Sequence, residues 1–262
     1  MRVFPGTSSR RPRGAFTLLE LLVTIAIIAS LASLGLSSLG TIKRKVAGVT
    51  CLNNLRQVGM ALTMYADDYH GLLPSLSFRD DTNLVQGNRA WDVPVQICEK
   101  LLSYGATRRI LGCPTRGERL SDGAWNYSTN YRVIGYCIAT RGAPRVRKAN
   151  TFYSLTTLAP IIRDEFQNAP ELSSSLVAPT VAVLVADPII SAGSNTNNRA
   201  LNKYSGLGGG YLINGKTVEH GAAHLYKNLP ERCNAFFADG HAARKSFLDT
   251  IPRTEREPTF WW

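Results

Sequence analysis

The stretch FTLLELLVTIAIIASLASLGLSSL, residues 16–39, contains a single charged side chain, that of Glu20. A helix over these residues would be about 36 Å long, which exceeds the roughly 30 Å of a bilayer's hydrocarbon core. The stretch therefore predicts a membrane-spanning helix. A carboxylate inside such a helix costs at least ~2.5 kcal/mol at its centre, so Glu20 is expected to have a function and a partner.

Basic residues flank the apolar stretch on both sides, and the leader before it, residues 1–15, has no acidic residue. The flanking clusters are Arg10, Arg11 and Arg13 before it and Lys43, Arg44 and Lys45 after it. Basic residues beside a hydrophobic segment set membrane orientation more often than they bind phosphate backbones. Although the formal net charge is +11, we therefore expect no nucleic-acid partner.

The order of a basic leader, a small residue and Phe-Thr-Leu-Leu-Glu resembles the type III signal of type IV pilins and type II secretion pseudopilins. The resemblance implies that prepilin peptidase cuts between Ala15 and Phe16 and that the new amino group of Phe16 is methylated. It also implies that Glu20 assists assembly, paired with the amino terminus of a neighbouring subunit. The family usually has Gly before the cut, and here Gly14 lies one residue further back. Cleavage after Gly14 is therefore the alternative, and it would make Glu20 the sixth mature residue.

Beyond the apolar stretch, we expect the helix to continue as an amphipathic helix over residues 40–71. Gly71 and Pro74 provide a stop. Apolar residues recur there in steps of three or four, which is the spacing of one helical face. These residues are Val46, Val49, Leu52, Leu55, Val58, Leu62, Tyr65 and Tyr69.

Residues 72–262 are expected to form a globular α+β head, in which the long N-terminal helix packs on an antiparallel β-sheet. TVAVLVA, residues 180–186, is a β-branched run that predicts a central strand. Asp239 and Gly240 predict a two-residue hairpin turn, because both residue types tolerate positive φ. The glycine-rich residues 206–210 lack the pattern of a phosphate-binding loop and are predicted to be an ordinary loop.

Two further segments resemble a large subgroup of bacterial proteins with the same cleavage and methylation segment. TCLNNLRQVG, residues 50–59, and the pair Cys113 and Pro114 carry the first resemblance, which implies a disulfide between Cys51 and Cys113. The second runs from His224 to FADGH, residues 237–241, and is similar to that subgroup's C-terminal signature of a His followed by an Asp-Gly hairpin. The five cysteines contain no CxxC pair, which excludes zinc-ribbon and thioredoxin spacings.

Three residues near the C-terminus, His224, Asp239 and His241, are candidates for a metal site of imidazole and carboxylate ligands. EHGAAH, residues 219–224, lacks the HExxH pattern of zinc proteases, and hairpin histidines more often form ordinary hydrogen bonds. We therefore expect no metal or other cofactor. No GxSxG elbow or pair of catalytic carboxylates stands out, and we expect no enzymatic activity.

Together, the residues and the resemblance predict a pseudopilin-like structural subunit of a type II secretion or type IV pilus-like assembly. It would be a single-pass protein of the bacterial inner membrane with its head in the periplasm or at the cell surface. Its partners would be prepilin peptidase and other pilin or pseudopilin subunits. The alternative is a membrane-anchored extracytoplasmic binding protein with a ligand or metal site near the Asp-Gly-His hairpin.

Overall fold

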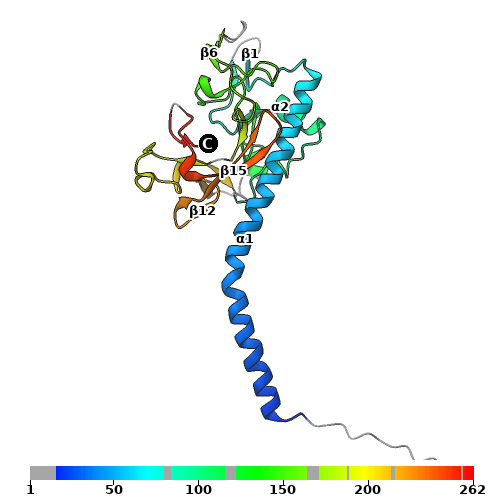
Figure 1. Cartoon of the computed structure of the whole chain (residues 1–262), viewed down its shortest axis with the longest axis vertical. Coiled ribbons are helices and arrows are strands. Elements are labelled where there is room, and N and C mark those ends of the chain that lie inside the picture. Colours follow the sequence, from blue (N-terminus) through cyan, green and yellow to red (C-terminus); the bar gives the residue numbers. More distant parts are fainter. Residues whose placement is uncertain are drawn as a thin grey trace, which may run out of the picture. The chain divides into compact units, whose positions relative to one another are not determined.

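The computed structural model describes residues 16–79, 84–115, 122–163, 171–187, 189–213, 216–254 and 256–262. The chain divides into two compact units, Met1–Lys43 and Arg44–Trp262. Figure 1 shows one long helix at the start of the described chain and a head of short strands after it. This is an α+β architecture, as the sequence predicts.

The long helix, α1, runs from Leu18 to Asp68 without interruption, which confirms the predicted continuous helix. It stops where the backbone enters left-handed conformations, at His70 with φ 55° and Gly71 with φ 83°. The Gly71 amide donates to the carbonyl of Ala66 at 2.7 Å, a bond typical of helix C-termini that end on glycine. Among the described residues, no helix combines the length and the apolar composition needed to cross a membrane.

The helix face buried in the second unit differs in part from the predicted one. Leu55, Val58 and Leu62 are buried as expected, whereas Val46 and Val49 are exposed. Small residues occupy much of the contact because they let the helix backbone approach the strands closely. The small buried residues of this face are Gly48, Cys51, Gly59, Ala61 and Ala66.

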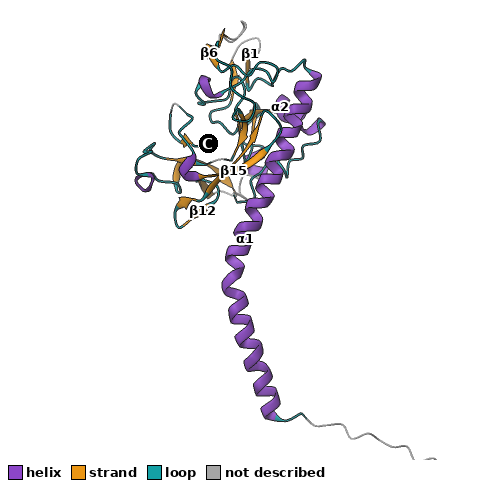
Figure 2. Cartoon of the chain, viewed as in Figure 1, coloured by secondary structure: helices purple, strands orange, loops and turns teal. Residues whose placement is uncertain are grey.

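A four-stranded antiparallel sheet in the order β15-β14-β8-β5 forms the centre of the second unit. The strands are β5 (Cys137–Ile138), β8 (Val183–Ala186), β14 (Arg232–Phe237) and β15 (Ala242–Ser246). All four residues of β8 are buried, which confirms the central strand predicted from the β-branched run. In Figure 2 strand β15 lies beside the later part of α1, and the Phe236 ring of β14 packs against Gly59 of the same helix.

Shorter elements complete the second unit, and every pairing between its named strands is antiparallel. The paired strands are β1 (Ser77–Arg79) with β2 (Leu84–Gln86), β3 (Asp92–Pro94) with β4 (Tyr131–Val133), β6 (Ile161–Arg163) with β7 (Glu171–Leu172), β9 (Ile190–Ser191) with β16 (Thr259–Phe260), β10 (Leu207–Ile213) with β11 (Lys216–His220), and β12 (Leu225–Tyr226) with β13 (Leu229–Pro230). The helices are α2 (Val95–Ser103), α3 (Asp122–Trp125) and the 3₁₀ turns η2 (Lys148–Asn150), η3 (Arg199–Leu201) and η4 (Phe247–Asp249).

The hairpin between β14 and β15 is present, but its loop is longer than predicted. The Phe237 amide donates to the His241 carbonyl at 2.9 Å, which leaves three loop residues rather than two. Gly240 occupies the left-handed region with φ 87°. A type I turn followed by a left-handed residue is the usual three-residue hairpin, and Asp-Gly suits it equally well.

The glycine-rich segment is also different from its predicted form. Residues 207–213 form strand β10, paired with β11, rather than a loop. The register of this pairing shifts between Leu207 and Tyr211, so the glycines at residues 208–210 lie at an irregularity of the strand, where glycine is common. The Asn-Gly pair at residues 214–215 lies outside the described residues.

Candidate functional site

The first candidate site is the start of α1, where Thr17 and Glu20 form a reciprocal cap. The Glu20 carboxylate accepts hydrogen bonds from the Thr17 amide and hydroxyl, both at 2.9 Å. The Glu20 amide in turn donates to Thr17 Oγ1 at 3.2 Å. This is a capping box, which satisfies amide groups that a helix start leaves without intrahelical partners. The predicted cleavage residues Gly14 and Ala15 lie outside the described residues.

The first turns of α1 present apolar side chains on all sides. Every side chain from Phe16 to Ser33 is exposed, and Phe16 itself is 75% exposed. A soluble monomer rarely leaves an apolar surface of this extent uncovered. The exposed large side chains of this segment are Phe16, Leu18, Leu19, Leu21, Leu22, Val23, Ile25, Ile27, Ile28 and Leu31.

The second candidate site is a buried cluster of four side chains in the second unit. Cys51 lies in α1, and Cys113 lies in the connection between α2 and α3. Asp187 directly follows β8, and His224 lies in the connection between β11 and β12. One donor atom of each residue lies within 4.8 Å of the corresponding atoms of the other three. No other group of three or more His, Cys, Asp or Glu side chains converges in this way in the part of the chain that the structure describes.

Direct contacts link the cluster in a ring. Cys51 Sγ lies 3.1 Å from Cys113 Sγ and 2.9 Å from Asp187 Oδ1. The other Asp187 oxygen lies 2.8 Å from His224 Nε2. That same nitrogen is 3.9 Å from Cys113 Sγ, which closes the ring.

Neighbouring groups hold the cluster from outside. The Asn234 amide donates to Asp187 Oδ2 at 2.8 Å, which orients the carboxylate. Thr115 Oγ1 lies 3.0 Å from Cys113 Sγ and accepts from the His224 amide at 3.3 Å. The side-chain nitrogen of Asn234 lies 3.4 Å from His224 Nε2, while its Oδ1 has no hydrogen-bond partner among the described residues.

Burial and mutual contact shift the pKa values of the cluster in different directions. Burial raises the pKa of the Cys51 thiol well above its ordinary value, and its contacts with Cys113 and Asp187 raise it further. For Cys113, burial disfavours the thiolate, but hydrogen bonds from Cys51 and His224 bring its pKa down to about 6. Burial also disfavours a charged His224, yet the Asp187 carboxylate raises the pKa of this imidazole to about 10. These opposed shifts arise because the side chains are buried and in direct contact with one another.

The backbone around the cluster is shaped to bring its segments close. A Cβ added to Gly135 would lie 2.2 Å from the Cys113 amide nitrogen, so only glycine allows this approach. The Gly135 amide also donates to the Leu111 carbonyl at 2.6 Å. His224 has φ 55°, a left-handed conformation that is uncommon outside glycine and asparagine and that recurs at functional sites.

The structure brings some of the predicted site residues together and separates others. Cys51 and Cys113 are neighbours as free thiols, so the disulfide between them stays a prediction. His224 does not join Asp239 and His241. Those two residues form an exposed pair at the β14–β15 loop, with His241 Nδ1 2.5 Å from Asp239 Oδ1. The ligand set on which the binding-protein alternative depends is therefore not assembled.

Two residues of these sites are absent from the sequence-based predictions. Thr17 forms a Thr-x-x-Glu pattern with Glu20, which is a recognised sequence signal for a capping box. Asp187 directly follows the buried strand β8, and an acidic residue in that position is a weaker sequence signal for a functional site. Its partners Cys51 and His224 come from distant segments, and nothing in their spacing points to it.

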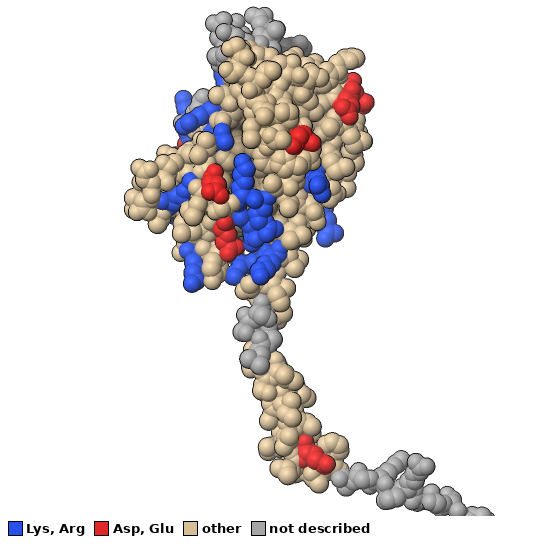
Figure 3. Space-filling view, in the orientation of Figure 1, with Lys and Arg blue, Asp and Glu red and all other residues tan. Residues whose placement is uncertain are grey.

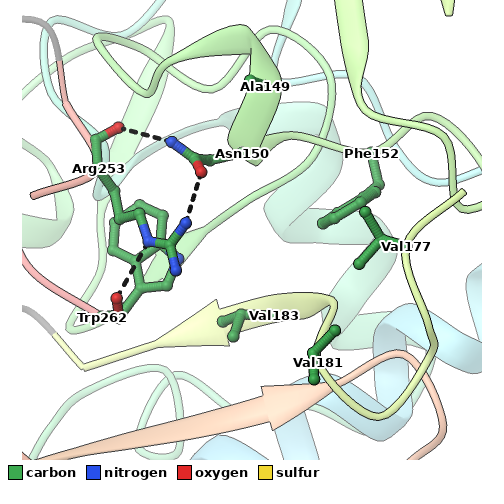
Figure 4. Close-up of a pocket in the computed structure, with 8 residues that line it drawn as sticks. All are labelled: Ala149, Asn150, Phe152, Val177, Val181, Val183, Arg253 and Trp262. Atoms are coloured by element: carbon green, nitrogen blue, oxygen red, sulfur yellow. Dashed lines mark hydrogen bonds between the residues drawn. The ribbon is translucent and has the colours of Figure 1, made fainter. Parts of the chain in front are cut away.

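A small pocket of about 90 Å³ lies elsewhere in the second unit, as Figure 4 shows. Its charged member is Arg253, which donates to Asn150 Oδ1 at 2.7 Å and to the Trp262 carbonyl at 3.1 Å. These contacts hold the Arg253 side chain in place against the pocket wall. The remaining lining residues are Ala149, Phe152, Val177, Val181 and Val183, so the pocket offers no reactive constellation.

Comparison with known families identifies the N-terminal segment. The family model of the prokaryotic N-terminal methylation motif matches residues 10–36. The match includes the second part of the leader, Phe16 and Glu20, and it supports a type IV pilin-like, envelope-associated protein. Searches of curated proteins and of solved structures found no match.

Proposed function

We propose that this chain is a pseudopilin-like structural subunit of a type II secretion or type IV pilus-like assembly. In this proposal prepilin peptidase cuts the leader between Ala15 and Phe16, and the new amino terminus is methylated. The observation that carries the proposal is the methylation motif at residues 10–36, which coincides with an exposed apolar helix that begins at Leu18.

Exposed apolar side chains explain why the N-terminal helix would need partners. Burying a large apolar side chain is worth about 1.5–3 kcal/mol, so a segment of ten such residues favours a lipid or protein environment. In Figure 3 the described part of this segment shows no Lys or Arg, and its one acidic side chain agrees with Glu20 as the only charge of residues 16–39. In the proposal, lipid covers the segment before assembly and neighbouring helices cover it afterwards.

The orientation follows from the charge of the leader. The leader, residues 1–15, contains four arginines, one more than the three basic residues 43–45 after the apolar segment, and the more basic flank favours the cytoplasmic side of a membrane. The head, residues 72–262, would then lie in the periplasm or at the cell surface. Its role would be structural, and the proposal assigns it no catalytic activity.

Glu20 supplies the contact between subunits in this proposal. In the single chain its carboxylate is exposed, and among the described residues its hydrogen-bond donors are the uncharged amide and hydroxyl of Thr17. A buried carboxylate is best compensated by a cation that is also hydrogen-bonded to it. The amino group of Phe16 on a neighbouring subunit, created by cleavage, is such a cation.

Mass spectrometry of the mature N-terminus tests the proposal. The protein would be extracted from membranes of a host with an active prepilin peptidase and, as a matched control, from a host without it. We expect a peptide that begins with N-methylated Phe16 from the first host and the complete leader from the second. A peptide that begins at Ala15 would move the cut to Gly14, and an intact leader in both hosts would refute the proposal.

A further inference from the structure

The buried cluster formed by Cys51, Cys113, Asp187 and His224 contains donor types that suit one particular metal. Two sulfurs, one imidazole nitrogen and one carboxylate oxygen are all ligands that Zn²⁺ takes in proteins. Calcium and magnesium prefer sets made only of oxygen, and soft thiolates select against them. The four donor atoms lie within 4.8 Å of one another, although Cys51 and Asp187 are 136 residues apart in the chain.

We propose that these four residues form a buried structural zinc site that joins α1 to the central sheet. The site is independent of the assembly role proposed above, because every ligand belongs to the unit Arg44–Trp262.

The distances between donor atoms are close to those of a tetrahedral zinc site. From Zn–S bonds of about 2.3 Å and Zn–N or Zn–O bonds of about 2.0–2.2 Å, ligand atoms should be about 3.3–3.8 Å apart. The four contacts of the ring measure 2.8 Å, 2.9 Å, 3.1 Å and 3.9 Å, and all the donor atoms lie within 4.8 Å of one another. Shifts of less than about 1 Å, within reach of side-chain rotation, would therefore bring all four into position.

The surroundings of the cluster also resemble those of a metal site. In metal sites, hydrogen bonds from neighbouring residues orient the ligands. Here the Asn234 amide donates to Asp187 Oδ2, and the hydroxyl of Thr115 is hydrogen-bonded to Cys113 Sγ. Asn234 is fully buried beside His224, and its Oδ1 lacks a partner among the described residues. A buried polar atom without a partner is uncommon, and it indicates a site whose polar contents are incomplete.

Four protein donors and complete burial favour a structural role over a catalytic one. A catalytic zinc keeps one position open for water or substrate, whereas a structural zinc is closed by four protein ligands. Each donor here comes from a different segment, so one ion would hold α1, the loop with Cys113, the end of β8 and the β11–β12 connection. The pairing of Cys51 and Cys113 as a disulfide is the competing state, because disulfide sulfurs are not thiolate ligands.

The test uses the full chain, extracted in detergent and purified without chelators or added metal. We expect elemental analysis to find one zinc per chain and intact-mass analysis to find all five cysteines reduced. Cys113→Ser and His224→Ala should each remove the zinc. Cys98→Ser is the matched control, because Cys98 is buried in α2 outside the cluster, and it should retain the full zinc content.

Replacement of zinc by Co²⁺ gives a readout that does not depend on variants. If the site exists, the wild-type protein should show the strong visible bands of tetrahedral cobalt and a near-ultraviolet sulfur-to-cobalt band. Three results would overturn the proposal. They are a Cys51–Cys113 disulfide in protein without zinc, reduced protein that takes up neither zinc nor cobalt, and zinc that persists in folded His224→Ala.

Discussion

At the scale of single residues, Glu20 caps the start of its own helix in the single chain. Its carboxylate accepts a hydrogen bond from the Thr17 hydroxyl, and its backbone amide donates one to the same hydroxyl. A helix start is also the positive end of the helix dipole, which favours an acidic side chain there. The same carboxylate can therefore stabilise the helix in the single chain and become available to an amino group in an assembly.

Two substitutions of Glu20 separate these roles. Glu20→Gln keeps an oxygen that can accept from the Thr17 amide, while Glu20→Ala removes the bonds to the carboxylate and leaves only the bond from the residue-20 amide to Thr17 Oγ1. If pairing between subunits depends on charge, both variants should be processed normally and both should be lost from crosslinked filaments. Processing is measured by N-terminal mass spectrometry and assembly by the crosslinked fraction. Assembly of Glu20→Gln at the wild-type level would show that Glu20 acts only as a cap.

At the scale of elements, the contact between α1 and β14 depends on small residues. A Cβ on Gly59 would lie 2.2 Å from the ring of Phe236, so the ring packs directly on the helix backbone. Helical period predicts that Leu55, Val58 and Leu62 are buried. It does not predict that Gly48 and Gly59 are buried, because glycine does not count as an apolar residue in the helical pattern.

Replacement of Gly59 tests this contact. In an exposed helix, Gly→Ala stabilises by up to about 1 kcal/mol, because alanine has the higher helix propensity. Gly59→Ala should instead lower the free energy of unfolding by about 1–3 kcal/mol, since the methyl group overpacks the Phe236 ring. Gly40→Ala is the control, because a Cβ there meets nothing within 4 Å. Denaturant unfolding in detergent measures both, and an unchanged midpoint for Gly59→Ala would contradict the packing.

At the scale of the whole molecule, the two units differ in what stabilises them. The buried hydrophobic core begins at Cys51 and extends to Trp262, so it lies within the unit Arg44–Trp262. No described residue of the unit Met1–Lys43 belongs to this core. Its described apolar side chains are exposed, so only lipid or another protein chain would cover them.

A fragment of residues 44–262 should therefore fold without the N-terminal segment. We expect it to be monomeric without detergent and to unfold in one cooperative transition, as a domain with its own core does. Circular dichroism against denaturant and the dispersion of its NMR spectrum measure this. A fragment without a cooperative transition would show that the head requires the preceding helix. The same fragment extended to residue 16 is the matched control, and it should require detergent to remain monomeric.

Some features follow from interactions between residues close in the chain, and the sequence alone predicts them. The apolar stretch, the helical period, the strand before Asp187 and the turn at Gly240 are of this kind, because each depends on a few consecutive side chains. The methylation motif belongs with them, and its family match agrees with the sequence-based prediction. The buried cluster is different, because Cys51 and Asp187 meet only after α1 packs on the sheet. Folding sets such distant contacts through the shape of the whole core, and no spacing in the sequence encodes which acid will lie beside which thiol.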